Sequence, residues 1–100
     1  MSNGVKTLVV YRPKQGKEAE LYALVKKHGP VLESTGLTVG GVPQLYKARN
    51  VRTGAEFFVE IFSWRDEQAS SLAHQTPAIM AVWEPMTPLL ESLEISVLEE

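Results

Sequence analysis

His74 is the residue of this chain best suited by type and position to acid–base chemistry. It follows Ala73 near the end of a segment, residues 66–75, whose pattern predicts a helix. A neutral imidazole can remove a proton from a phenol or from the carbon beside a carbonyl, and the electron-rich anion that results can react with dioxygen. We therefore predict that His74 is a catalytic base. The alternative is a histidine that caps helix carbonyls or bonds Thr76.

A second histidine, His28, lies on the apolar stripe of an earlier helical segment. Leu21, Leu24, Val25 and Leu32 recur there at helical spacing, and His28 falls among them. Its side chain is therefore predicted to enter the space between helix and sheet, where it would orient a substrate. A hydrogen-bonded core histidine would have the same pattern.

Glu60 lies in the middle of a predicted strand, between Phe58 and Phe62. A carboxylate in apolar surroundings either takes up a proton or pairs with a cation, because an unpaired buried charge costs several kcal/mol. Glu60 is thus a candidate acid, base or substrate-binding group. The alternative is an ion pair with Lys47 or Arg49 of the preceding strand.

Three large aromatic residues are candidates for the wall of a pocket. Tyr11, Trp64 and Trp83 could stack on a flat aromatic substrate, although rings at these spacings also occur in ordinary cores. Together with His28 and Glu60 they form the predicted substrate-binding set around His74.

Composition excludes several other kinds of chemistry. The chain has no cysteine, no cluster of histidine and carboxylate residues at metal-ligand spacing, and no glycine-rich phosphate loop, so we expect neither a metal nor an organic cofactor. The net charge is −2 and no basic patch is present, which argues against nucleic-acid binding. The apolar runs are too short to span a membrane, and no signal-peptide core precedes residue 7. We therefore expect a cytoplasmic protein without a membrane partner.

The order of predicted elements indicates how these residues are positioned. The 100 residues form one domain. Strand and helix patterns alternate as β-α-β-β-α-β, an α+β ferredoxin-like fold with a four-stranded antiparallel sheet and both helices on one face. The expected segments are strands at 5–12, 44–51, 57–64 and 93–97, and helices at 17–34, with a break at Gly29-Pro30, at 66–75 and from 77. Residues 38–43 are expected to form a flexible connection.

Both faces of the third strand are apolar. Phe57, Val59 and Ile61 line one side, and Phe58, Phe62 and Trp64 line the other. The helices can cover only one face of the sheet, and we predict that the second set lies on the uncovered face. Burying that face requires a second copy of the chain, so we expect a homodimer formed through the sheet face.

Several motifs spread over the whole chain resemble a known family. The run FFVEIFSW, the Ser/Asp/Glu-rich segment after it, the Ala-His pair, the QTP step and the downstream AVWEPM are similar to antibiotic biosynthesis monooxygenase-like proteins of the dimeric α/β-barrel superfamily. The first strand, ending VVYR, and the helix ending LVKKH resemble the first half of that family. The haem-degrading branch of the superfamily carries an asparagine on its first strand, which VKTLVVYR lacks, and this argues against haem degradation.

The resemblance implies a function as well as a fold. It suggests a cofactor-independent monooxygenase that acts on a small hydrophobic or aromatic, enolisable molecule, in a single family-like domain spanning residues 1–100. Two alternatives stay open. One is a non-catalytic barrel that binds a small ligand or serves as a stress-related dimer, and the other is an isomerase or lyase on the same fold.

Overall fold

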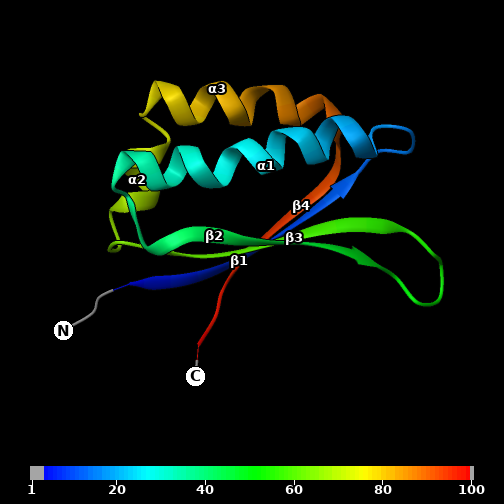
Figure 1. Cartoon of the computed structure of the whole chain (residues 1–100), viewed down its shortest axis with the longest axis horizontal. Helices are drawn as coiled ribbons and strands as arrows, with labels where there is room; N and C mark the ends of the chain where they lie inside the picture. Colours follow the sequence, from blue (N-terminus) through cyan, green and yellow to red (C-terminus); the bar gives the residue numbers. More distant parts are fainter. Residues whose placement is uncertain (1–3, 100) are drawn as a thin grey trace.

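The computed structural model describes residues 4–99, which form one four-stranded sheet with a layer of helices on one face (Figure 1). The strands are antiparallel to their neighbours, in the order β2-β3-β1-β4. The predicted β-α-β-β-α-β arrangement is confirmed. Its elements are β1 (Val5–Pro13), α1 (Glu18–Thr35), β2 (Thr38–Arg49), β3 (Glu56–Trp64), α2 (Ala69–Ala73), α3 (Pro77–Met86), a 3-10 helix η1 (Thr87–Leu89) and β4 (Leu90–Val97).

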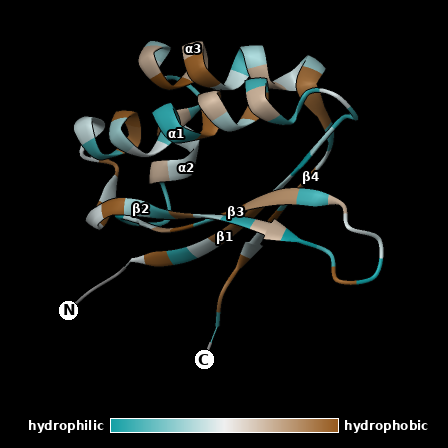
Figure 2. Cartoon of the chain, turned by 45° about the vertical axis from the view of Figure 1, so that its right-hand side comes forward, coloured by the Kyte–Doolittle hydropathy of each residue, from teal (hydrophilic) through white to brown (hydrophobic). Residues whose placement is uncertain are grey.

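The strand register determines which side chains share the helix-covered face. In the central pair β1–β3, Tyr11 lies opposite Phe58 and Val9 lies opposite Glu60. Residues directly opposite each other in an antiparallel pair point to the same side, so these four side chains face the helices together. All four are buried. Hydrophobic residues occur along both the helices and the sheet (Figure 2), and the buried core takes residues from both.

The predicted assignment of the two faces of β3 is wrong. Phe58, Phe62 and Trp64 are buried beneath the helices, not on the open face. Half-buried Phe57, Val59 and Ile61 lie on the open face instead. The larger rings fill the gap between the sheet and α1, where Tyr22 packs against Phe58 with 4.9 Å between ring centroids.

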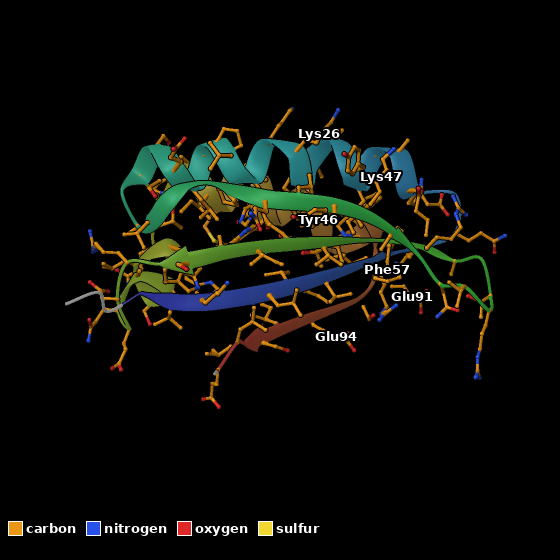
Figure 3. All side chains as sticks on the ribbon, turned by 60° about the horizontal axis from the view of Figure 1, so that its bottom comes forward. Lys26, Tyr46, Lys47, Phe57, Glu91 and Glu94 are labelled. Atoms are coloured by element: carbon orange, nitrogen blue, oxygen red, sulfur yellow. The ribbon has the colours of Figure 1, made fainter. Side chains whose placement is uncertain are left out.

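The open face of the sheet is nevertheless apolar, as expected from a strand with apolar residues on both faces. Leu8 and Val10 of β1 lie opposite Ile61 and Val59, and all four are half-buried. Tyr46 of β2, opposite Val59, is exposed at the same surface (Figure 3). An apolar open face is therefore present, as predicted, but it carries Phe57, Val59 and Ile61 and not Phe58, Phe62 and Trp64.

Two predicted boundaries differ from the structure for backbone reasons. Residues 38–43 belong to β2, where Gly40 and Gly41 both adopt φ of 89° and the register with β3 shifts, so the glycines bend a strand and do not end it. The helix α1 continues through Pro30, which lies on its exposed side, so the break expected at Gly29-Pro30 does not divide it into two helices.

The helix expected from Asp66 starts three residues later, at Ala69. Asp66 instead accepts a hydrogen bond from the backbone N–H of Gln68 in a turn. The helix expected from residue 77 is confirmed, with Pro77 opening α3 directly after Thr76. Gly36 ends α1 in the left-handed conformation, and Gly54 adopts positive φ in the β2–β3 turn.

Candidate functional site

A buried hydrogen-bond network centred on Glu60 joins three elements of the fold. The Tyr11 hydroxyl donates to Glu60 Oε1 at 2.6 Å, and His28 Nδ1 lies 2.8 Å from the same oxygen. Tyr11 comes from β1, His28 from α1 and Glu60 from β3, and their exposed fractions are 3%, 2% and 1%. The network therefore lies in the layer between the helices and the sheet.

The hydrogen bond from Trp83 determines where the His28 proton resides. The indole Nε1–H of Trp83 lies 2.7 Å from His28 Nε2. An indole nitrogen can only donate, so Nε2 must be the acceptor and carries no proton. The proton of the neutral ring is then on Nδ1, from which it is donated to Glu60. His28 is thus held in one tautomer by a donor on one side and a carboxylate on the other.

Tyr11 stays protonated in these surroundings. Burial raises the pKa of its phenol well above the usual value, and the negative charge of Glu60 and the hydrogen bond to it raise the pKa further. The phenol consequently serves as a fixed donor that orients the carboxylate of Glu60.

The helix α1 packs closely against β2 beside His28. Gly29 is buried where α1 crosses β2, and a Cβ atom at that position would lie 3.4 Å from Cδ of Pro43 and 3.5 Å from Cγ1 of Val42. These are ordinary van der Waals distances, so helix and strand pack closely beside the histidine.

A small pocket of about 180 Å³ opens beside the network. The residues that line it include His28, Tyr11, Trp83 and Thr87, which carry polar groups, and the other lining side chains are apolar. Because a small ligand there would contact both the imidazole and an apolar wall, the pocket suits a compact, flat and mostly apolar molecule. The lining consists of Val9, Tyr11, His28, Phe62, Trp83, Met86, Thr87, Leu90 and Leu93.

The structure brings together four of the six predicted site residues. Tyr11, His28 and Trp83 line the pocket, and Glu60 lies behind them in the network. Trp64 is buried but packs edge-on against Phe62, with 5.0 Å between ring centroids, and does not line the pocket. The alternative partners predicted for Glu60 are engaged elsewhere: Arg49 lies 4.0 Å from Glu56, and Lys47 lies over the Tyr22 ring.

His74 is exposed at the C-terminal end of α2 and lies outside the pocket lining. Its ring packs on the outer side of Trp83, with 4.9 Å between ring centroids. Its predicted role as a base stays a prediction. Among the pocket residues that the sequence did not single out are Phe62, Met86, Leu90 and Leu93. The only signal for them was their place in apolar patterns.

The next two features concern possible metal ligands and possible membrane-spanning helices among the described residues. Residues 4–99 contain no group of three or more histidine, cysteine or carboxylate side chains able to hold a metal ion. Among the helices that the structure describes, none has the length and hydropathy to cross a bilayer.

Comparison with known proteins identifies the fold. No protein-family model and no curated protein sequence matches the chain. Solved structures do match over nearly its whole length. Rv0793 from Mycobacterium tuberculosis has a TM-score of 0.77 and 17% identity, with 98% of this chain and 95% of that one covered. PA3566 from Pseudomonas aeruginosa has a TM-score of 0.78 and 16% identity, with 100% and 96% covered.

A third match has a described activity. SnoaB from Streptomyces nogalater, a cofactor-independent oxygenase, has a TM-score of 0.69 and 15% identity, with 98% of this chain and 93% of that one covered. Sequence identities this low establish a shared fold only, and any activity has to be argued from the residues of the site. This chain has the βαββαβ fold of the dimeric α/β-barrel proteins, as the resemblance in its sequence predicted.

Proposed function

We propose that the protein is a cofactor-independent monooxygenase that acts on a small aromatic, enolisable molecule. The observation that carries the proposal is the pair His28–Glu60, a neutral imidazole held by a buried carboxylate at the wall of an apolar pocket. The shared fold with SnoaB supports the oxygenase reaction class but says nothing about the substrate.

The proposed first step is removal of a proton from the substrate. His28 lines the pocket, and its Nε2, the nitrogen that is not bonded to Glu60, accepts the proton of an enol or phenol hydroxyl in this proposal. The resulting imidazolium is stabilised by the carboxylate of Glu60, which already accepts the Nδ1–H. Tyr11 holds that carboxylate in place through its 2.6 Å hydrogen bond, so the base does not have to reorient during proton transfer.

The second step uses the anion itself as the reductant of dioxygen. The enolate gives one electron to dioxygen, and the radical and superoxide combine to form a carbon–oxygen bond. The peroxide takes the proton from His28, the oxygen–oxygen bond breaks, and water leaves as the remaining hydrogen on that carbon is lost. A methylene carbon and one dioxygen thus become a carbonyl and one water. An apolar pocket favours this chemistry because it admits dioxygen and limits water.

The same geometry accommodates an isomerase or lyase. Tyr11, which stays protonated, and His28, whose Nε2 is an acceptor, both line the pocket, so a proton donor and a proton acceptor border the same space. A reaction of that class would return the proton to the substrate and would proceed without oxygen. Anaerobic turnover would therefore identify it.

The test is oxygen uptake with anthrone and a panel of hydroxynaphthalenes, corrected for their spontaneous oxidation. We expect His28→Gln to lower kcat/KM by at least about 100-fold, the lower end of a general-base contribution. His74→Gln, the same substitution at the exposed histidine, should stay within a few-fold of the natural protein. The reverse pattern would transfer the role of base to His74, as the sequence predicted. Binding without turnover in any variant would favour a non-catalytic ligand-binding barrel.

A further inference from the structure

Trp83 occupies the one nitrogen of His28 that a substrate would need. Nδ1 is hydrogen-bonded to Glu60 and Nε2 accepts from the indole, so both nitrogens have a hydrogen-bond partner within the protein. We infer that Trp83 is the specificity-determining residue of the pocket, and that it is displaced by ligands that bring their own hydrogen-bond donor. This inference rests on the proposed function, because it concerns the same base.

The indole lies where displacement is feasible. Trp83 is half-buried on α3, whereas His28 is fully buried behind it. Its ring is flanked by two imidazoles: His28 on the inner side at 5.8 Å between centroids, and His74 on the outer side at 4.9 Å. The outer neighbour is an exposed side chain, so outward movement of the ring displaces no buried side chain on that side.

The size of the pocket also points to movement of Trp83. About 180 Å³ is below the roughly 300 Å³ at which ligand pockets usually begin. Because Trp83 is part of the pocket wall, outward rotation of its ring would enlarge the pocket as well as free Nε2. One side-chain movement would therefore provide both the space and the free Nε2 that a bound aromatic molecule needs.

The same hydrogen bond selects the class of ligand. An apolar ligand that pushes the indole aside leaves a buried acceptor on His28 unpaired, which is costly. A phenol or enol hydroxyl restores the hydrogen bond at Nε2. Molecules with a hydroxyl donor should therefore bind about 10-fold or more tightly than isosteres that carry a methyl group instead.

The test follows the indole N–H of Trp83 by NMR, with 2-naphthol and 2-methylnaphthalene as a matched pair of probes. Trp83→Phe assigns the signal, since the chain has two tryptophans. In the free protein the signal should have the downfield position of a short hydrogen bond, and saturation with 2-naphthol should move it to the position of an unbonded indole. We expect 2-methylnaphthalene to bind at least about 10-fold more weakly.

Trp83→Phe keeps a ring but removes the donor, so it should bind 2-naphthol about 3- to 10-fold more tightly than the natural protein. Tyr22→Phe, which also removes a polar group from an aromatic ring but lies outside this pocket, should leave the affinity unchanged. An indole signal that stays in place while 2-naphthol binds, or equal affinities for the two probes, would overturn the inference. Failure of 2-naphthol to bind either protein would also overturn it.

These results can be separated from failure of the proposed function. Displacement of the indole by 2-naphthol, without oxygen uptake by any panel compound, would support the role of Trp83 and count against the oxygenase. Oxygen uptake that depends on His28, with an unmoved indole signal, would support the oxygenase and overturn the role of Trp83.

Discussion

The rings of Tyr22 in α1 and Phe58 in β3 pack together, with 4.9 Å between centroids and 43° between planes. This contact lies on the helix-covered face of the central strand β3. Because side chains alternate along a strand, Phe57 and Val59 must then point to the opposite, open side.

The open face leads to a prediction about assembly. This fold typically assembles into dimeric barrels, and Val59 lies in the middle of the open face, between Val10 and Tyr46 on the neighbouring strands. We predict a homodimer through this face, and Val59→Glu should convert it to a monomer by placing a charge in the apolar interface. Light scattering or sedimentation at micromolar concentration measures the result.

The matched control is Val51→Glu, the same substitution at a hairpin residue that is 99% exposed. This variant should assemble like the natural protein. A natural protein that is monomeric at these concentrations, or a Val59→Glu variant that remains a dimer, would contradict the assignment of the interface.

The sequence predicted the order of elements but not the orientation of β3. Alternation showed that both faces of the strand are apolar. Which face is covered depends on contacts between distant residues, such as Phe58 and Tyr22, which are 36 positions apart in the printed sequence. A pattern that is apolar on both faces carries no information about which face a helix will cover.

The network at the site was only partly predictable for a similar reason. Glu60 among aromatic residues indicated that it needs a partner, and the helical stripe placed His28 on the inner side of α1. That the two meet, with Tyr11 as the third member, depends on strand register and on the close packing at Gly29, which no local pattern specifies.

The raised pKa of Tyr11 predicts a loss of stability in alkaline solution. Above about pH 10 a tyrosine in the unfolded chain loses its proton, whereas buried Tyr11 keeps it. The unfolded state then binds fewer protons than the folded state, so the free energy of unfolding falls as pH rises. Below pH 10 this contribution is constant. Urea unfolding at pH 9, 10 and 11 measures the slope.

Two phenylalanine variants isolate the effect. Tyr11→Phe should lose stability at every pH, because the hydrogen bond to Glu60 is gone, but should show a shallower decline above pH 10. Tyr46→Phe makes the same change at an exposed ring and should decline as steeply as the natural protein. Equal slopes for all three proteins would show that Tyr11 does not carry the effect.

The C-terminus of α1 predicts a backbone effect on stability. Gly36 has φ of 74°, and a Cβ atom there would meet nothing within 4 Å. Gly36→Ala should therefore lower the free energy of unfolding by about 1–2 kcal/mol through conformation alone. Gly36→Asn should recover part of that loss, because asparagine tolerates the left-handed region. Urea midpoints give the comparison, and an unaffected alanine variant would show that the helix can end in another conformation.

Glu60 should matter more for turnover than for binding. Glu60→Gln keeps the shape of the side chain but removes the negative charge that stabilises the imidazolium of His28. We expect kcat to fall by about 100-fold or more with little change in KM, and the free energy of unfolding to fall by about 1–3 kcal/mol. Steady-state oxygen uptake and urea unfolding on the same preparation give both quantities.

Glu60→Asp separates charge from packing. It retains the carboxylate but withdraws it from Tyr11 and His28 by one methylene, so it should lose stability like the glutamine variant while recovering part of kcat. If the two variants lost kcat equally, the length of the side chain would matter more than its charge. If neither lost kcat while both lost stability, Glu60 would only support the fold, and His28 would act as a base without a carboxylate partner.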